Sequence, residues 1–163
     1  MTDGKPAILD GIPTDLPPEL NVLMGVFLLY WKIDEVMETI NVTPVLTKNE
    51  RQVLVNLAAP RRMGELAGEM QVLPSALTAI ADGMEEKGLV TRERDPDDRR
   101  AWRLVLTAAG IEKRKALMAR AVEIFSEVSG LTRSETETIA SLMQKVTRNI
   151  KANGLPQGAK PCQ

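Results

Sequence analysis

Two adjacent arginines, Arg99 and Arg100, close a short polar segment that separates two stretches of alternating apolar residues. The segment covers residues 95–100, DPDDRR, and its Asp and Pro content is typical of a turn. A guanidinium holds a fixed charge and forks toward phosphate or carboxylate oxygens, so the pair is a candidate for anion recognition. Asp98 precedes the pair and can orient Arg100 through a bidentate contact. The plainer alternative is a solvated turn tip.

Other arginines leave two interpretations open. Arg61 and Arg62 precede a short helix expected from Met63, where they either contact phosphate near the helix N-terminus or form a solvated pair. Three more lie on the predicted strands, and phosphate contact and pairing with Glu93 and Asp95 are equally open for them: Arg92, Arg94 and Arg103.

The composition excludes several kinds of chemistry. The 163 residues include no histidine and one cysteine, Cys162, so a Cys/His zinc site is excluded and the usual catalytic base is missing. The sequence shows neither a glycine-rich phosphate loop nor a paired-carboxylate arrangement. We therefore expect no catalytic residues, no metal and no cofactor. The net charge of −1 is low for a nucleic-acid-binding protein, but phosphate contacts need only a local basic face.

Membrane attachment is also not expected. The longest apolar run, residues 22–31, is shorter than the roughly 20 residues that span a bilayer. The first residues lack the basic start and apolar block of a signal peptide. We expect a cytoplasmic protein.

Hydrophobic periodicity predicts four helices, two strands and two further helices. The first helix, residues 18–41, carries two apolar stripes and so predicts burial on two sides, which in a small chain indicates a partner subunit. Thr47 with Glu50 and Thr132 with Glu135 predict capping boxes, and Gly88 and Gly130 predict helix ends. The remaining elements are expected at residues 63–70, 74–87, 89–94, 101–106 and 107–129.

Three short helices followed by a hairpin are the layout of a winged helix-turn-helix. In that layout the third helix enters the major groove, and an arginine on the hairpin can enter the minor groove beside it. We therefore predict a mostly α fold with a small two- to three-stranded β wing, flanked by N- and C-terminal helices.

Two stretches resemble the MarR family of regulators. Residues 66–90 are similar to its helix-turn-helix, and residues 95–110, DPDDRRAWRLVLTAAG, resemble its wing signature. That signature is matched by Asp98 with Arg100, then by Leu106, Thr107 and Gly110. The resemblance covers residues 18–152.

The resemblance implies a domain layout and partners. It implies a single domain over 18–152, with dimerisation helices at 18–42 and 107–152 and a winged helix-turn-helix at 47–106. The Pro, Gly and Asp content of residues 1–16 predicts a flexible arm before this domain, and Gly154 with Pro156 predicts a flexible tail (153–163) after it. The homodimer would bind double-stranded DNA at a pseudo-palindromic operator with half-sites roughly 10–10.5 bp apart. A small, often aromatic, effector would bind in a cleft. Trp31 and Met24 are candidates for that pocket, although interface or core packing is an alternative.

The expected recognition helix departs from the family. Relatives often carry arginine at the positions of Ala79 and Gly83, whereas this helix has no basic residue before Lys87. Small side chains form its expected DNA-facing front: Ser75, Ala76, Thr78 and Ala79. We therefore expect this helix to read DNA bases weakly, so that recognition depends on DNA shape and on the wing. The alternative is that this helix packs against protein.

Together these observations predict a homodimeric DNA-binding transcriptional regulator, a repressor that a small ligand releases. The near-zero charge and the arginine-free helix leave an alternative, a winged-helix protein-interaction module that does not bind DNA.

Overall fold

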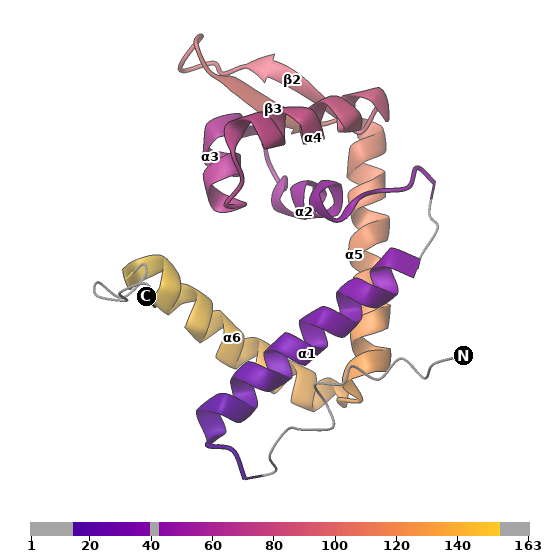
Figure 1. The fold of residues 1–163 in the computed structure, drawn as a ribbon, viewed down its shortest axis with the longest axis vertical. Helices are drawn as coiled ribbons and strands as arrows, with labels where there is room; N and C mark the ends of the chain where they lie inside the picture. Colours follow the sequence, from indigo (N-terminus) through magenta and orange to yellow (C-terminus); the bar gives the residue numbers. More distant parts are fainter. Residues whose placement is uncertain (1–14, 40–42, 154–163) are drawn as a thin grey trace. The chain divides into compact units, whose positions relative to one another are not determined.

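The computed structural model describes residues 15–39 and 43–153, which contain six helices and three strands (Figure 1). The elements follow the predicted order, with one short strand added before α3. They are α1 (Pro18–Thr39), α2 (Lys48–Asn56), β1 (Arg61–Arg62), α3 (Met63–Glu69), α4 (Pro74–Glu86), β2 (Val90–Arg94), β3 (Trp102–Leu106), α5 (Ala108–Ser129) and α6 (Arg133–Asn153).

The chain separates into two units, one ending at Val128 and one beginning at Ser129. The first holds α1 to α5 and the sheet, and the second holds α6. The predicted arm (1–16) and tail (153–163) lie almost wholly outside the described residues, as do residues 40–42 at the end of the first predicted helix.

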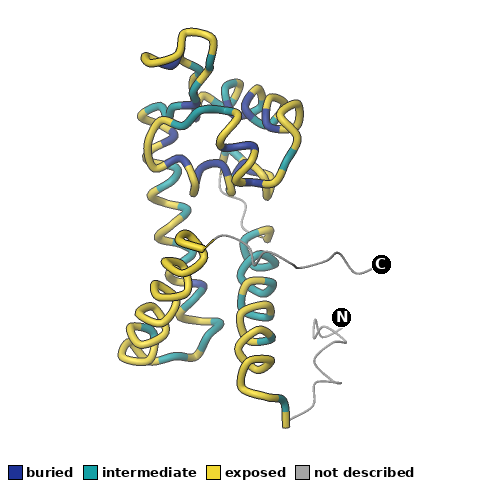
Figure 2. Tube along the Cα trace, turned by 90° about the vertical axis from the view of Figure 1, so that its left-hand side faces the viewer, coloured by how far each residue is buried: buried dark blue, intermediate teal, exposed yellow. Residues whose placement is uncertain are grey.

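The core lies among α2, α3, α4 and the sheet, which together we call the winged module (residues 46–106). Figure 2 shows the buried residues concentrated there. The fully buried side chains include Leu54, Leu66, Leu77, Met84 and Leu104. Leu77, Ala81 and Met84 recur at helical spacing, so they turn one face of α4 inward and leave the opposite face exposed.

The sheet has the strand order β1-β3-β2 and is antiparallel throughout. Its register places Arg62 opposite Arg103 and Arg94 opposite Trp102. The sequence predicted a wing of two or three strands, and the structure confirms this prediction with a sheet of three strands. A two-residue strand has no periodicity of its own, so its pairing with β3 could not be located from the sequence.

The predicted helix ends are confirmed. The backbone N–H of Thr47 donates to the Glu50 carboxylate at 2.8 Å, and the Glu50 N–H donates back to the Thr47 hydroxyl at 3.3 Å. The corresponding distances at Thr132 and Glu135 are 2.8 and 3.4 Å. Gly88 and Gly130 have φ values of 68° and 64°, in the left-handed region that glycine occupies without strain.

A tight joint connects the sheet to α5. The Thr107 hydroxyl donates to the Gly88 carbonyl at 2.7 Å, and the Gly110 N–H donates to the Thr107 hydroxyl oxygen at 3.0 Å. The Thr107 N–H also donates to the Leu89 carbonyl at 3.1 Å. A Cβ at position 110 would overlap that same carbonyl oxygen, so only glycine fits. The Leu-Thr-x-x-Gly segment is therefore the joint between wing and helix.

Candidate nucleic-acid interface

The exposed face of α4 carries the small residues that the sequence predicted. Ser75, Ala76, Thr78 and Ala79 are all exposed, whereas Leu77 between them is fully buried. The Thr78 hydroxyl donates to the Pro74 carbonyl at 3.0 Å, which leaves its oxygen lone pairs as acceptors. This face can approach a duplex closely, but it offers few donors for base readout.

The same face becomes acidic toward the C-terminal end of α4, where Asp82 and Glu86 are exposed. Gly83 points inward, because a Cβ there would lie 3.3 Å from the Glu50 carboxylate. The family's arginine position at 83 thus faces α2 in this chain. Glu50 already binds Lys87, at 2.6 and 2.7 Å.

Arg92 holds α4 against β2. Its guanidinium contacts the carboxylates of Asp82 at 2.7 Å and Glu85 at 2.6 Å, and it donates to the Thr78 carbonyl at 2.9 Å. Phosphate contact and ion pairing were both left open for Arg92, and the structure shows ion pairing. The acids lie on α4 and are not the predicted Glu93 and Asp95.

The other two strand arginines are also engaged. Arg103 pairs with Glu93 at 3.0 Å, as one alternative predicted. The guanidinium carbon of Arg94 lies 3.9 Å from the centre of the Trp102 ring, and an Arg94 N–H donates to the Arg99 carbonyl at 3.2 Å. Trp102 is 43% exposed, so it is only partly used for packing.

Arg61 and Arg62 are ion-paired and not merely solvated. Arg61 binds Glu69, and Arg62 binds Asp95 through two bonds, at 2.7 and 3.1 Å. The Arg62 guanidinium, followed by bonds from backbone N–H groups, holds the pKa of the Asp95 carboxyl far below its usual range. Pairing across 33 residues leaves no local pattern, so this contact could not be found from the sequence.

The expected contact between Asp98 and Arg100 takes a different form. The Asp98 carboxylate accepts a hydrogen bond from the Arg100 backbone N–H at 3.0 Å, and the described residues contain no ion pair between the two side chains. An aspartate two residues before an N–H closes a local turn, and this use of the carboxylate replaces the predicted bidentate pair.

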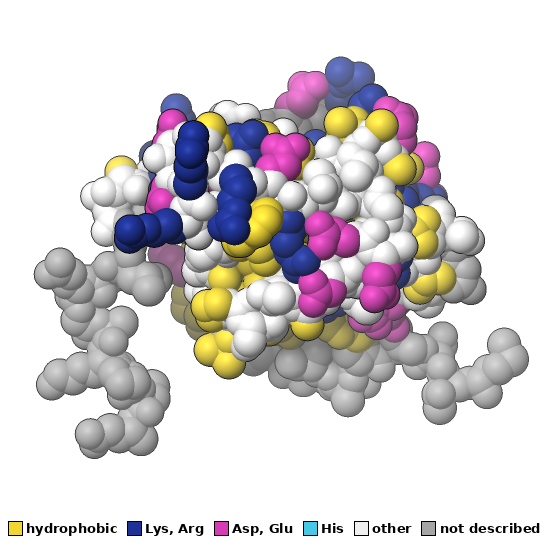
Figure 3. Space-filling model, turned by 90° about the horizontal axis from the view of Figure 1, so that it is seen from above, with side chains coloured by type: hydrophobic (Ala, Val, Ile, Leu, Met, Phe, Trp, Pro, Cys, Tyr) yellow, Lys and Arg dark blue, Asp and Glu magenta, His cyan; other side chains and the backbone are white. Residues whose placement is uncertain are grey.

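Arg99 and Arg100 remain unengaged at the wing tip. Both are exposed, and within residues 43–106 they are the arginines whose side chains have no ion pair, hydrogen bond or ring contact. Figure 3 looks onto the wing side and shows Lys and Arg side chains gathered toward one end of that face, at the left. Local positive charge therefore accompanies a net charge of −1.

A hollow of about 60 Å³ lies where α1, α2 and α5 approach one another. Apolar and cationic side chains share its wall: Met37, Leu46, Arg51, Lys113, Ala116, Leu117 and Arg120. Burial lowers the pKa of Lys113. Trp31 and Met24 are half-buried on α1 but are not among these lining residues. A pocket role for those two residues stays a prediction, and the three cations of the hollow were not identified from the sequence.

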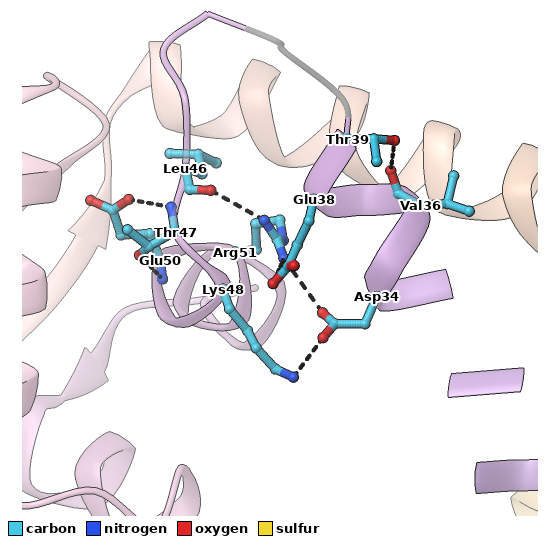
Figure 4. Close-up of polar contacts among 9 residues, drawn as sticks. All are labelled: Asp34, Val36, Glu38, Thr39, Leu46, Thr47, Lys48, Glu50 and Arg51. Carbon is cyan, nitrogen blue, oxygen red and sulfur yellow. Dashed lines mark hydrogen bonds and ion pairs between the residues drawn. The ribbon is translucent and has the colours of Figure 1, made fainter. Parts of the chain in front are cut away.

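Ion pairs connect α1 to α2 beside this hollow (Figure 4). Asp34 accepts from Lys48 at 2.6 Å and from Arg51 at 3.4 Å, and Glu38 lies 4.0 Å from Arg51. Arg51 also donates to the Leu46 carbonyl at 3.1 Å. Arg51 thus contributes both to the contact between the helices and to the wall of the hollow.

Among residues 15–39 and 43–153, no three His, Cys, Asp or Glu side chains cluster in a way that could hold a metal ion. In the same ranges, no helix combines the length and apolar character needed to cross a bilayer.

Three short helices, a small antiparallel sheet and an arginine-tipped hairpin define a winged helix-turn-helix protein. A family model described as the MarR family matches residues 46–102, from just before α2 to the start of β3. The structure titled Multiple Antibiotic Resistance Repressor, MarR, has a TM-score of 0.66 at 25% identity, covering 85% of this chain and 98% of the other.

Two curated relatives come from Bacillus subtilis (strain 168). The HTH-type transcriptional repressor MdtR is 37% identical over 99 residues, which are 56% of this chain and 63% of that relative. The uncharacterized HTH-type transcriptional regulator YpoP is 30% identical over 106 residues, which are 63% of this chain and 75% of that relative. The chain belongs to the MarR family of transcriptional regulators. This membership confirms the predicted family and fold and argues against an enzyme.

Proposed function

We propose that this protein is a homodimeric DNA-binding transcriptional regulator that represses by occupying a pseudo-palindromic operator. The observation that carries the proposal is the pair of unengaged guanidinium groups at the wing tip, Arg99 and Arg100. Every other arginine of the described winged module is held by an acid, a carbonyl oxygen or an aromatic ring. Unpaired cations beside an exposed helix of small residues suit a duplex, with the tip in the minor groove and α4 in the major groove.

The test is a fluorescence anisotropy titration of a labelled duplex from the protein's own upstream region. Replacing Arg99 and Arg100 with alanine should weaken binding roughly tenfold or more and reduce the slope of log affinity against log salt by about one to two. A double variant with the same charge loss, Lys115→Ala with Arg133→Ala, should leave both quantities almost unchanged. Equal losses in the two double variants would contradict a specific role for the wing tip.

The dimer is supported by apolar residues that the described chain leaves at its surface. On α6 they recur at helical spacing with exposed fractions between 36% and 58%: Ile139, Leu142, Met143, Val146 and Ile150. On α1 the exposed set includes Leu20, Leu23, Phe27 and Tyr30. Apolar stripes of this kind mark association surfaces, and a second copy of the chain is the partner that the two-site operator requires.

Release by a small effector is supported by the hollow beside α2. Its apolar wall and its cationic groups suit a small aromatic anion, which would share Arg51 with Asp34 and Arg120 with Glu123. Benzoate should lower the affinity for the operator duplex more than benzyl alcohol, its neutral counterpart. Replacing Arg51 and Arg120 with methionine should remove that difference. Equal responses to the two compounds in the wild type would contradict an anion site.

One observation favours the alternative of a protein-interaction module, namely the absence of basic residues from the exposed face of α4 and the presence of Asp82 and Glu86 there. That alternative predicts no dependence of DNA affinity on Arg99 and Arg100 at low salt. The anisotropy experiment therefore separates the two functions.

A further inference from the structure

The carboxylate of Asp95 joins two segments that are far apart in the sequence. Asp95 directly follows β2 at the base of the wing turn and is only 7% exposed. One of its oxygens accepts from Arg62 Nε at 2.7 Å. The other accepts from Arg62 Nη2 at 3.1 Å and from the backbone N–H groups of Asp97 at 2.9 Å and Asp98 at 3.0 Å. A single buried side chain thus accepts four hydrogen bonds.

The partner of Asp95 is itself held in place. Arg62 pairs with Arg103 in the sheet and is the residue from which α3 begins. Its guanidinium is bonded to Asp95 at the base of the wing, although the side chain stays partly exposed. The Arg62–Asp95 pair therefore fixes the wing turn to the N-terminal end of α3, beside the exposed face of α4.

The hydrogen bonds then continue into the tip. Asp98, whose N–H is held by Asp95, accepts from the Arg100 N–H through its own side chain. The Ala101 N–H donates to the Asp98 carbonyl at 2.9 Å, and the Asp95 N–H donates to the Ala101 carbonyl at 3.0 Å. The backbone that carries Arg99 and Arg100 is thus ordered by bonds that begin at Asp95.

We propose that Asp95 and Arg62 are positioning residues for DNA binding, which hold the wing tip so that Arg99 and Arg100 project toward the duplex. The proposal rests on the proposed function and deepens it. Arg62, which sequence reasoning considered for phosphate contact, acts in this proposal through the wing and not on DNA. Asp95 recognises no base, and its role is to lower the entropy that Arg99 and Arg100 lose on binding.

Charge and positioning predict opposite results for the variant Asp95→Asn. Removing an acid near DNA raises the local positive potential, which by itself strengthens binding. Loss of the Arg62 pair and weaker bonds to Asp97 and Asp98 loosen the tip, which weakens binding. We expect the second effect to dominate, with affinity falling roughly tenfold, within the range of a lost base or backbone contact.

The matched control is Glu93→Gln. Glu93 lies on β2, two residues before Asp95, and pairs with Arg103. The substitution therefore removes the same charge without touching the backbone of the tip. Its affinity for the duplex should be unchanged or slightly higher. A similar loss in Glu93→Gln and Asp95→Asn would overturn the assignment to Asp95.

The closing experiment measures Asp95→Asn and Arg62→Met in two backgrounds, the wild type and the Arg99→Ala/Arg100→Ala variant, by anisotropy at one salt concentration. If the Arg62–Asp95 pair acts through the wing tip, both substitutions lower the affinity for the duplex in the wild type. Once Arg99 and Arg100 are absent, they change that affinity less than about twofold. Equal losses in both backgrounds show a general structural role and overturn the proposal. If the wild type and the wing-tip variant bind equally, the proposed function has failed instead.

Amide hydrogen exchange keeps the proposal testable if a variant binds too weakly to titrate. In Asp95→Asn the amides of Asp97 and Asp98 should exchange at least tenfold faster, while the amide of Leu77 in the core of α4 keeps its protection. Unchanged exchange at Asp97 and Asp98 overturns the positioning role. If the Leu77 amide also loses protection, the substitution has damaged the fold as a whole, and this result too overturns the local positioning role of Asp95.

Discussion

The winged module and α6 place their apolar residues in opposite environments. Within the module, Leu54, Leu66 and Leu77 have essentially no exposed surface, whereas α6 contains no buried residue and leaves Leu142 and Ile150 more than half exposed. Both segments show helical apolar periodicity, so the periodicity alone does not separate a helix that packs within its own chain from one that needs a partner. The structure separates them, because the module buries its apolar residues within the chain and α6 leaves its own exposed.

The largest effect in this comparison should come from the core of the module. Replacing Leu77 with alanine removes a fully buried side chain and should lower the free energy of unfolding by about 2–5 kcal/mol, measured by urea titration with circular dichroism. Leu73, four residues earlier and 73% exposed, is the matched control. Leu73→Ala should stay within about 0.5 kcal/mol of the wild type. Similar losses at the two positions would contradict the observed burial.

The second prediction tests whether the apolar face of α6 is an assembly surface. Val146→Glu places an unpaired charge in a surface that a symmetric dimer would bury twice, so the dimer dissociation constant should rise by about 100-fold or more. Analytical ultracentrifugation measures this constant. Gln144→Glu adds the same charge at a neighbouring polar position and should change the constant less than about threefold. A monomeric wild type would remove the basis of the prediction.

The third prediction concerns the joint between the module and α5. Gly110→Ala would force a methyl group against the Leu89 carbonyl and should destabilise the protein by about 1–3 kcal/mol. Gly68 on α3 has open space around its Cβ position, so Gly68→Ala should instead be neutral or stabilise by up to about 1 kcal/mol. Thermal unfolding of the two variants compares them directly, and destabilisation of the same size in both would speak against the overlap.

The fourth prediction uses pH. Burial of the Glu50 carboxyl opposes its ionisation, but hydrogen bonds from Lys87 and Thr47 outweigh burial and lower its pKa below the ordinary value of 4.5. A lowered pKa in the folded state stabilises the fold at neutral pH, and this contribution is lost as the pH falls below about 4.5. Unfolding free energies of wild type and Glu50→Gln, compared between pH 7 and pH 3, should therefore converge on acidification. A constant difference would exclude this linkage.

The smallest effect should be at the ion pairs between α1 and α2. Asp34→Asn should cost about 0.2–1 kcal/mol, because Lys48 is half exposed and solvent screens the pair. The i,i+3 pair of Glu112 with Lys115 on α5 is the control, and Glu112→Gln should cost no more than Asp34→Asn. Chemical denaturation at low and high salt measures both, and a loss of several kcal/mol for Asp34→Asn would mean that the pair behaves as a buried one.

Local features were predictable from the sequence, and long-range pairings were not. The capping box of Thr47 with Glu50 and the helix end at Gly88 each involve residues only a few positions apart, so a short sequence window is enough to predict them. Arg62 and Asp95 form the central contact of the wing, but their meeting depends on a strand of two residues and on the packing of the sheet. The inward direction of Gly83 likewise depends on the packing of α2 against α4. The wing signature predicted the positions of Arg99 and Arg100. The three-dimensional structure was needed to show that the other arginines of the winged module are already bound to acids, carbonyl oxygens or an aromatic ring.

The contact between Gly110 and the Leu89 carbonyl has a mechanical consequence. With Thr107 bonded to Gly88 and no spare volume between the two backbones, α5 cannot rotate about its first turn without displacing the start of β2. The first turn of α5 and the start of β2 are therefore expected to move together. A change in the direction of the first turn of α5 would also displace the base of the hairpin that carries Arg99 and Arg100.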